Sequence, residues 1–359
     1  MENIYSEIVK NLERKEKLAL ATIIARMGSA PREAGAKYLV KKEGKAIGSI
    51  GGGCVEADVW QEAQEAIEKG EGKVVHFKLT EEQLAEGGLI CGGNIDIFVE
   101  PLHDGFLDIY REVAKIHQKG GSGILATMIS VDGGFPKKEG IKVFFMESGE
   151  KVGFLFAGDE WEEKIFRKAE LLLKENEPKV LVVSSEEAGH PWKKLEILLE
   201  PIRSEPTVYI YGAGHISQQL VPLVKKVHFK VVVIDDREIF ANRDCFPEAD
   251  EVIVSEFERS FDQFTIDASS YIIIVTRGHL YDKFILEKAV KTNARYIGMI
   301  GSRRKIQVLY QDLITKGTRR ELLDRVHAPI GIDINSETPE EIAVSIVAQL
   351  IKVRREKLA

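Results

Sequence analysis

The chain of 359 residues has only three cysteines, Cys54, Cys91 and Cys245. An odd and sparse set argues against a disulfide framework and for a reducing compartment, so we expect the cytoplasm. The sequence also lacks basic runs that would bind nucleic acid, and its net charge is −7. It lacks an apolar run long enough to span a bilayer, and its charged opening has no secretion-signal core. We therefore expect neither nucleic acid nor a membrane as a partner.

What the sequence does contain is an internal repeat. The segment LALATIIARMGSAPREAGAKYLVKKEGKAIGSIGGG, from Leu18, resembles GILATMISVDGGFPKKEGIKVFFMESGEKVGFLFAG, from Gly123. At a constant shift of 105 residues the coincident pairs include Gly28 and Gly133, Pro31 and Pro136, Lys37 and Lys142, Gly44 and Gly149, and Gly48 and Gly153. Because turn-forming residues and element order agree together, duplication explains the likeness better than coincidence.

Each copy is predicted to form a strand, a Gly/Pro turn, a second strand, a tight turn, a third strand and then a helix. The predicted helices cover 55–69 and 160–176, and the copies end alike in NIDIFVEPL and KLEILLEPI. We therefore predict a duplicated N-terminal α/β region. Its first unit is residues 1–102, and residues 103–203 form a degenerate second copy.

The copies differ in their glycine and cysteine loops. GGGCVE, which contains Cys54, is matched by FAGDEW, and GGLICGGN, which contains Cys91, is matched by a segment without cysteine. A duplication that retains the scaffold twice but these loops once indicates that the two cysteines serve a site. The alternative is random loss of cysteines without a role, with CGGN merely a turn.

The run Gly51, Gly52 and Gly53 precedes a predicted helix. Without Cβ atoms these residues can adopt positive φ and let another group approach closely. Cys54 would then lie at or beside the helix N-terminus, where free amides and the helix dipole favour an anion, including a thiolate. The alternative is a tight strand-to-helix turn with a small buried cysteine.

After a short Pro-flanked linker the pattern changes to that of a dinucleotide-binding fold. TVYIYGAGHISQQLVPLVKKVHFKVVVIDDR predicts a strand, a glycine turn at Gly212 and Gly214, a helix from His215, and a second strand. His215 lies inside the turn, in position to contact a ligand. We therefore predict a Rossmann-like, doubly wound parallel sheet over residues 204–359.

The ribose-binding position of this fold falls on Asp235 or Asp236, because Asp235 lies 21 residues after the second glycine of the turn. The third glycine of the fingerprint is replaced by Ser217. Serine is small enough for the helix to pack on the strand, but the change weakens the prediction of ordinary NAD binding.

Two later predicted strands run into polar turns, TRGHLYD and GSRRK, which would meet the glycine turn at the carboxyl ends of the strands. Arg277, His279, Ser302, Arg303 and Arg304 would line that crevice around an anionic ligand. Positive charge is disfavoured at a helix N-terminus, which favours an anion partner for the arginines. The alternatives are a solvated first helical turn and, for His279, a loop histidine with satisfied hydrogen bonds.

Several strings together resemble one family. GSIGGGCVE, CGG, YGAGHIS, TRGH, YIGMIGSRRK and HAPIGIDINSETPEEIAVSI are similar to the XdhC/CoxI family of accessory proteins for molybdenum hydroxylases such as xanthine dehydrogenase. The resemblance covers residues 18–101 and 206–352. It implies a maturation chaperone rather than a catalyst. Such a protein binds molybdopterin cofactor while a partner cysteine desulfurase installs its sulfido ligand, and hands it to the apo-hydroxylase.

Under this resemblance the glycine runs 51–53 and 212–214 and the pair Arg303 and Arg304 are candidate cradles for the cofactor phosphate. Cys54 is a candidate molybdenum contact or persulfide carrier, assisted by Cys91. The alternatives are an NAD(P)-dependent oxidoreductase that uses the C-terminal fold and a protein-binding scaffold. The sequence does not decide whether the crevice binds NAD, FAD, a pterin or no ligand. It also does not decide whether the repeated N-terminal half mimics a dimer within one chain or whether the chain forms a real homodimer.

Overall fold

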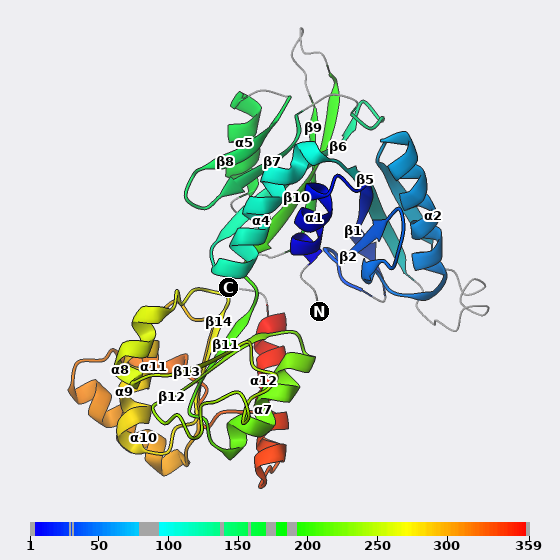
Figure 1. The fold of residues 1–359 in the computed structure, drawn as a ribbon. Helices are drawn as coiled ribbons and strands as arrows, with labels where there is room; N and C mark the ends of the chain where they lie inside the picture. The colour runs from blue at the N-terminus through cyan, green and yellow to red at the C-terminus, as the bar shows by residue number, and fades with distance from the viewer. Residues whose placement is uncertain are drawn as a thin grey trace. The chain divides into compact units, whose positions relative to one another are not determined.

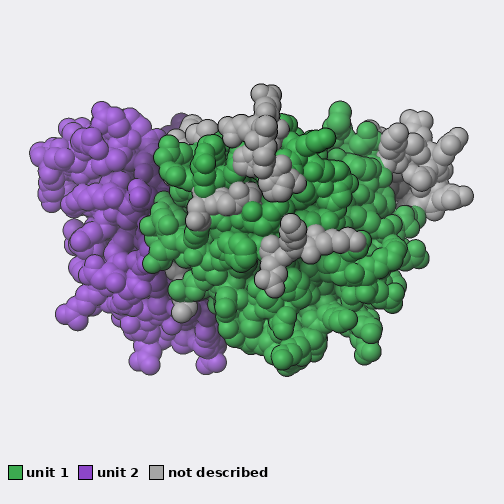
Figure 2. Space-filling model, turned by 90° about the horizontal axis from the view of Figure 1, so that it is seen from above, with its two compact units in different colours: residues 1–203, 357–359 green, residues 204–356 purple. Residues whose placement is uncertain are grey.

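The computed structural model describes residues 4–28, 30, 32–78, 93–136, 140–156, 159–169, 177–184 and 192–356. The chain forms two compact units, unit 1 from residues 1–203 and unit 2 from residues 204–356, which Figure 2 colours green and purple. Among the described helices, none is both long and apolar enough to cross a membrane.

The first half of unit 1 is an antiparallel sheet with one helix packed on each face. Its elements are α1 (Ile4–Glu13), β1 (Leu18–Met27), β2 (Lys37–Lys41), β3 (Ile47–Gly48), α2 (Gly53–Lys69), β4 (Lys73–Lys78) and β5 (Asn94–Leu102), with strand order β3-β2-β1-β5-β4. The apolar side chains spaced along α2, among them Val55, Val59 and Ala63, are buried against the sheet. The 3.6-residue periodicity of α2 therefore fixes which of its faces meets the core.

The second half of unit 1 repeats this topology. Its elements are η1 (Asp104–Phe106), α4 (Leu107–Lys119), β6 (Ser122–Val131), β7 (Ile141–Met146), β8 (Lys151–Leu155), α5 (Asp159–Ala169), β9 (Lys179–Ser184) and β10 (Lys194–Arg203), with strand order β8-β7-β6-β10-β9. Helices α1 and α4 pack against each other between the sheets (Figure 1). At the shift of 105 residues Tyr5 of α1 matches Tyr110 of α4, so the repeat also includes these two helices.

The two copies exchange buried ion pairs. Lys37 of the first copy pairs with Glu200 of the second, and Lys142 of the second pairs with Glu100 of the first, with Nζ 2.9 Å from Oε2. Burial is the largest single influence and lowers the pKa of Lys37, but the charge and hydrogen bond of Glu200, together with Tyr5 and Glu100, outweigh it and raise that pKa, so the pair remains ionic. Reciprocal pairs of this kind are typical of a two-fold dimer interface, here formed within one chain.

Unit 2 is a five-stranded parallel sheet with helices on both faces, as predicted. Its elements are β11 (Thr207–Tyr211), α7 (His215–Lys226), β12 (Lys230–Asp235), β13 (Glu251–Val254), α8 (Phe257–Ser260), η2 (Phe261–Gln263), β14 (Ser270–Ile274), α9 (His279–Ala289), β15 (Tyr296–Met299), α10 (Arg303–Thr315), α11 (Arg320–Asp324) and α12 (Pro339–Arg355). The strand order is β13-β12-β11-β14-β15. Helices α7 and α12 cover one face, and α9 and α10 cover the other (Figure 1).

The order of the strands reverses at β11, since β12 lies on one side of it and β14 on the other. Ligands of open α/β sheets bind at the carboxyl ends of the strands beside such a reversal. The glycine turn that follows β11 therefore lies at the position where a ligand crevice is expected.

Candidate functional site

The glycine run of unit 1 connects β3 to α2 with left-handed backbone. Gly51, Gly52 and Gly53 have φ of 135°, 79° and 61°, and Gly52 is the N-cap of α2. Residues other than glycine rarely adopt these φ values. The loop therefore requires glycine at these positions, and it places Cys54 in the first turn of α2.

Glu56 holds this loop in shape from the first turn of α2. Its Oε1 accepts hydrogen bonds from Ser49 Oγ at 2.7 Å, from the amide of Ile50 at 3.1 Å and from the amide of Gly52 at 2.9 Å. Partial burial alone raises the pKa of Glu56, but these hydrogen bonds outweigh it and hold the pKa below its usual value. The charged carboxylate of Glu56 therefore accepts hydrogen bonds from the loop amides of Ile50 and Gly52, which could otherwise bind an external anion.

Cys54 is a free and exposed thiol, which differs from the alternative of a buried structural cysteine. Its sulfur belongs to the first turn of the 17-residue helix α2. Cys91 lies outside the described residues, so its position relative to Cys54 stays a prediction. Within the described ranges, no group of three or more His, Cys, Asp or Glu side chains is arranged to hold a metal ion.

The glycine turn of unit 2 is built for close packing. The amide of Gly212 donates to the carbonyl of Ile234 at 2.8 Å, and a Cβ at Gly212 would lie 2.5 Å from the carbonyl oxygen of Val275. Gly214 is the N-cap of α7 and has open space where a Cβ would be. Ser217, at the third glycine position of the fingerprint, is fully buried and donates to the carbonyl of Gly212 at 2.5 Å. The serine therefore closes the turn from inside.

The carboxylate of Asp235 is already engaged by protein groups. It accepts from the amide of Ala213 at 2.8 Å and from Arg237 Nε and Nη2 at 2.8 and 3.0 Å, and the residue is 2% exposed. Burial alone raises the pKa of Asp235, but the hydrogen bonds from Arg237 and Ala213 outweigh it and lower the pKa. Asp235 thus fixes the glycine turn to the end of β12. Its carboxylate is therefore not free to bind a ribose without loss of these contacts.

The arginine after β14 lies close to the end of β12. Arg277 Nη2 is 2.9 Å from Asp236 Oδ2, so this ion pair joins the segments that follow β12 and β14, the two strands that flank β11. His215 and His279 are exposed first residues of α7 and α9, at the same edge of the sheet. The structure therefore brings the predicted residues that follow β11, β12 and β14 to one edge.

The predicted residues after β15 form the start of α10. Ser302 is the N-cap, and its side chain accepts from the amide of Lys305 at 3.3 Å. Arg303 and Arg304 are exposed, and within the described part of the chain neither forms an ion pair, whereas Lys305 pairs with buried Asp282 at 2.6 Å. The two arginines thus keep their charge available at a helix N-terminus, where an anion would compensate it.

Sequence reasoning assigned no role to Glu56 or Arg237. The string GSIGGGCVE contains the signal for the role of Glu56, because an acidic residue in the first helical turn after a glycine run can accept hydrogen bonds from the loop amides. Arg237 is visible in the string DDR, because an arginine two residues after Asp235 can form a bidentate pair with that carboxylate.

Comparison with known proteins identifies the family. A family model described as the XdhC Rossmann domain matches residues 208–350, and one described as the XdhC and CoxI family matches residues 11–78. A probable xanthine dehydrogenase subunit from Bacillus subtilis (strain 168) is 27% identical over 99% of this chain and 98% of its own length.

Two further relatives cover most of the chain. A molybdenum cofactor insertion chaperone, PaoD, from Escherichia coli (strain K12) is 22% identical over 93% of this chain and 83% of its own length. A crystal structure described as a xanthine dehydrogenase from Bacillus halodurans has a TM-score of 0.74 and 26% identity, covering 98% of this chain and 96% of that chain. Since matches to one family lie in both units, the chain belongs to the XdhC and CoxI family.

Proposed function

We propose that this protein matures a molybdenum hydroxylase of the xanthine dehydrogenase type. It binds molybdopterin cofactor as cargo, assists sulfuration of the cofactor with a cysteine desulfurase, and delivers the cofactor to the apo-hydroxylase in the cytoplasm. Relatives named as a molybdenum cofactor insertion chaperone and as a probable xanthine dehydrogenase subunit match 93% and 99% of the chain and support this role.

The observation that carries the chemical part of the proposal is the exposed thiol of Cys54 on a braced loop. Glu56 fixes the loop, and a cysteine thiolate is both a soft metal ligand and a sulfur nucleophile. In sulfur transfer, the Cys54 thiolate attacks the outer sulfur of a desulfurase persulfide. One S–S bond then forms at Cys54 while the donor S–S bond breaks, and the donor leaves as a thiolate.

The crevice of unit 2 supports anion binding more than nicotinamide oxidoreduction. Arg303 and Arg304 and the amides at the start of α10 suit a phosphate, as carried by molybdopterin. The alternative of an NAD(P)-dependent oxidoreductase needs a carboxylate for the adenosine ribose, for which Asp235 and Asp236 are the candidates. Asp235 is buried and bound to Arg237, and Asp236 is paired with Arg277. These contacts disfavour the alternative, because a ribose would have to displace an arginine.

Cofactor retention and hydroxylase activation test the proposal. The purified chain is incubated with molybdopterin cofactor released from a donor enzyme and desalted, and retained molybdenum and pterin are measured. The loaded protein is then mixed with apo-hydroxylase and desulfurase. We expect Cys54→Ser to abolish activation and Arg303→Ala with Arg304→Ala to reduce retention, while Cys245→Ser, at the third cysteine, behaves as wild type.

Two results would contradict the proposal. One is absence of retention together with tight binding of a nicotinamide nucleotide, which would favour the oxidoreductase. The other is normal retention and activation by Cys54→Ser and by Cys91→Ser, which would leave both cysteines without a part in maturation.

A further inference from the structure

Unit 2 contains a groove of about 380 Å³ beside α10, a helix that Figure 1 labels. The residues that line it come from α10, from the first residue of α11 and from the segment after α11, and they are Arg303, Ile306, Gln307, Tyr310, Gln311, Arg320, Ala328 and Pro329. The α10 residues recur at the three- and four-residue intervals that place side chains on one face of a helix. The groove therefore runs along α10.

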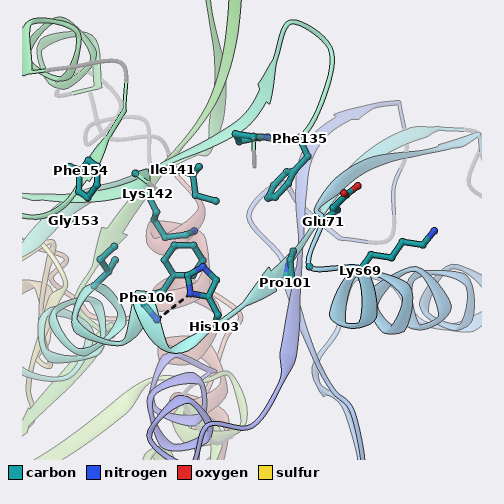
Figure 3. A pocket seen from close by; sticks show the side chains of 15 residues that line it. Lys69, Glu71, Pro101, His103, Phe106, Phe135, Ile141, Lys142, Gly153 and Phe154 are labelled. Carbon is teal, nitrogen blue, oxygen red and sulfur yellow. Dashed lines mark hydrogen bonds between the residues drawn. The ribbon is translucent and has the colours of Figure 1, made fainter. Parts of the chain in front are cut away.

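A larger cavity, of about 620 Å³, lies in unit 1, and charges of both signs line it (Figure 3). Lys69 and Glu71 are both part of its wall, and the ammonium of Lys142 pairs with Glu100 at 2.9 Å. Because charges of both signs line it, this cavity does not favour an anion. In contrast, the described lining of the groove in unit 2 contains two arginines and neither aspartate nor glutamate. The groove beside α10 therefore favours an anionic ligand.

The two arginines lie toward opposite ends of the groove. Arg303 and Tyr310 are seven residues apart on α10, which is about 10 Å along the helix axis at the usual rise per residue. Burial raises the pKa of Tyr310 to about 12, the charge of Arg320 opposes this rise, and Asp324 adds to it. Arg320 is therefore close enough to act on the phenol, and it lies at the Tyr310 end of the groove.

Both guanidinium groups have N–H donors for a ligand. Arg303 is exposed and forms no ion pair within the described part of the chain. Arg320 contacts Asp324 through Nε at 2.9 Å, and both of these side chains are more than half exposed. An exposed pair of this kind contributes little to stability, and the Nη atoms of an arginine carry four further N–H donors. A carboxylate of a ligand can therefore bind at each end of the groove.

The lining between the arginines suits a peptide chain. Gln307 and Gln311 each carry N–H donors and a carbonyl acceptor, which match the acceptor and donor groups of a peptide backbone. Tyr310 and Pro329 add an aromatic and an apolar surface, as is typical of grooves that bind proline-rich segments. A free phosphate is too small to reach both arginines at once. The groove therefore fits an acidic peptide better than a small anion.

The length and the volume of the groove select the conformation of such a peptide. In polyproline II, three residues complete one turn with a rise of about 3.1 Å each, so side chains three residues apart lie on one side and about 9 Å from each other. In a β-strand, side chains three residues apart point to opposite faces. A helical segment about 10 Å long and 10 Å wide occupies roughly 800 Å³, about twice the volume of the groove.

We propose that this groove binds an acidic segment of a partner protein in the polyproline II conformation, with two carboxylates three residues apart that pair with Arg303 and Arg320. The inference goes beyond the proposed maturation function, because the groove recognises a protein segment and not the cofactor. Arg303 also belongs to the proposed phosphate site, whereas Arg320 does not. Variants of Arg320 therefore test the groove without touching the cofactor site.

Fluorescence anisotropy of labelled peptides mixed with the full chain tests the groove. The probe is a proline-rich hexapeptide with two glutamates three residues apart, compared with an isomer whose glutamates are two residues apart and with a version that has glutamine at both positions. We expect the first peptide to bind about fivefold or more tightly than the isomer, and the glutamine version not to bind.

Arg320→Ala is expected to weaken binding of the first peptide about tenfold or more, because hydrogen bonds to a charged group are lost. Its side chain is 63% exposed, so the truncation is compatible with folding. The matched control is Arg319→Ala, which removes an exposed arginine next to Arg320 that is not among the described lining residues, and it should stay within about twofold of wild type.

Binding that depends on both the glutamate spacing and Arg320 supports the proposal. Absence of binding, equal binding of the two glutamate isomers, or binding that Arg320→Ala leaves unchanged overturns it. Displacement of the peptide by inorganic phosphate at an equal concentration also overturns it, because the groove would then be a site for small anions. Failure of cofactor retention or of hydroxylase activation with peptide binding intact contradicts the maturation function only.

Discussion

The two copies in unit 1 share their strand order and differ in the loop between the third strand and the following helix. In the first copy three glycines and an exposed cysteine fill this loop, and Glu56 accepts its amides. In the second copy Glu162 of α5 accepts the amide of Leu155, the residue that matches Ile50, and pairs with Lys151 at 2.5 Å. A glutamate therefore braces both loops, whereas the cysteine occurs in one.

This difference distinguishes the residues that stabilise the fold from the loop that contains the candidate reactive cysteine. The lysine, glutamate and threonine of the buried pairs occur in both copies, because each lysine requires the glutamate of the other copy. Loss of either partner leaves a buried charge unpaired, so the pairs constrain both halves equally. The loop faces solvent and has no such reciprocal constraint. The second copy thus acts as a built-in partner that completes the core of the first.

The largest effect is expected from breaking one exchanged pair. Lys142→Met leaves Glu100, whose side chain is 4% exposed, without its cation, and we expect a loss of about 3–5 kcal/mol in unfolding free energy. The three tryptophans of the chain, Trp60, Trp161 and Trp192, all belong to unit 1. Tryptophan fluorescence during urea unfolding therefore reports this unit.

The matched change Lys37→Met tests whether the copies are equivalent. Lys37 is 10% exposed, so we expect a similar or slightly smaller loss. The double variant Lys142→Met with Glu100→Leu should recover most of the stability, because no charge then stays buried. A double variant as unstable as Lys142→Met would show that packing, not the unpaired charge, causes the loss.

A second comparison uses matched glycines. Gly48 and Gly153 have φ of 90° and 84°, and a Cβ at either would collide with the carbonyl oxygen of the matched lysine, Lys37 or Lys142. We expect Gly48→Ala and Gly153→Ala each to lose at least about 2 kcal/mol in urea unfolding, from positive-φ strain and the collision together.

The control pair is Gly44 and Gly149, which match each other in the repeat. They also have positive φ, but a Cβ at either would meet no atom within 4 Å. Alanine there should cost only about 1–2 kcal/mol, the strain of left-handed backbone. Equal losses at both pairs of positions would mean that the contact with the lysine carbonyl is unimportant.

Local patterns predicted much of unit 2. The strands predicted before and after the glycine turn and its helix coincide with β11 and β12. Helix α12 begins at a capping box formed by Thr338 and Glu341, which the string SETPEEIAVSI contains. Such features depend on neighbouring residues and are visible in sequence. The engagement of Asp235 by Arg237 was not predicted, because a string does not show which oxygen atoms of a carboxylate are already bound.

Long-range features of unit 1 could not be predicted. Lys37 and Glu200 are 163 residues apart, and no local pattern marks them as partners. Helices α1 and α4 were not included in the repeat, since few of their residues coincide apart from Tyr5 and Tyr110. The predicted helix 160–176 is present as α5 up to Ala169, and 170–176 lie outside the described residues.

A smaller effect is expected at Glu56, and it depends on pH. The pKa of Glu56 is lowered by folding, so its stabilisation is complete above its unfolded pKa and is lost as pH falls through the folded pKa. We expect Glu56→Gln to lose about 1–2 kcal/mol at pH 7, with the difference from wild type narrowing from about pH 5 toward pH 3.

The matched variant Glu162→Gln sharpens the comparison of the two braces. The side chain of Glu162 is 3% exposed and also pairs with Lys151. Glu162→Gln should therefore lower the free energy of unfolding by more than Glu56→Gln does. Only Glu56→Gln should also change the alkylation rate of Cys54, because only the first loop presents a thiol. An unchanged alkylation rate in Glu56→Gln would contradict the positioning of Cys54 by this carboxylate.

The smallest effect on stability is expected at Cys54, where the functional effect should be large. Cys54 is exposed, so Cys54→Ser should stay within about 0.5 kcal/mol of wild type. If the loop carries the chemistry that the second copy lacks, the same variant should fail to activate apo-hydroxylase, while Cys245→Ser activates it normally. If Cys54→Ser unfolds easily, Cys54 has a structural role. If Cys54→Ser is stable and fully active, the cysteine loop does not distinguish the two copies in function.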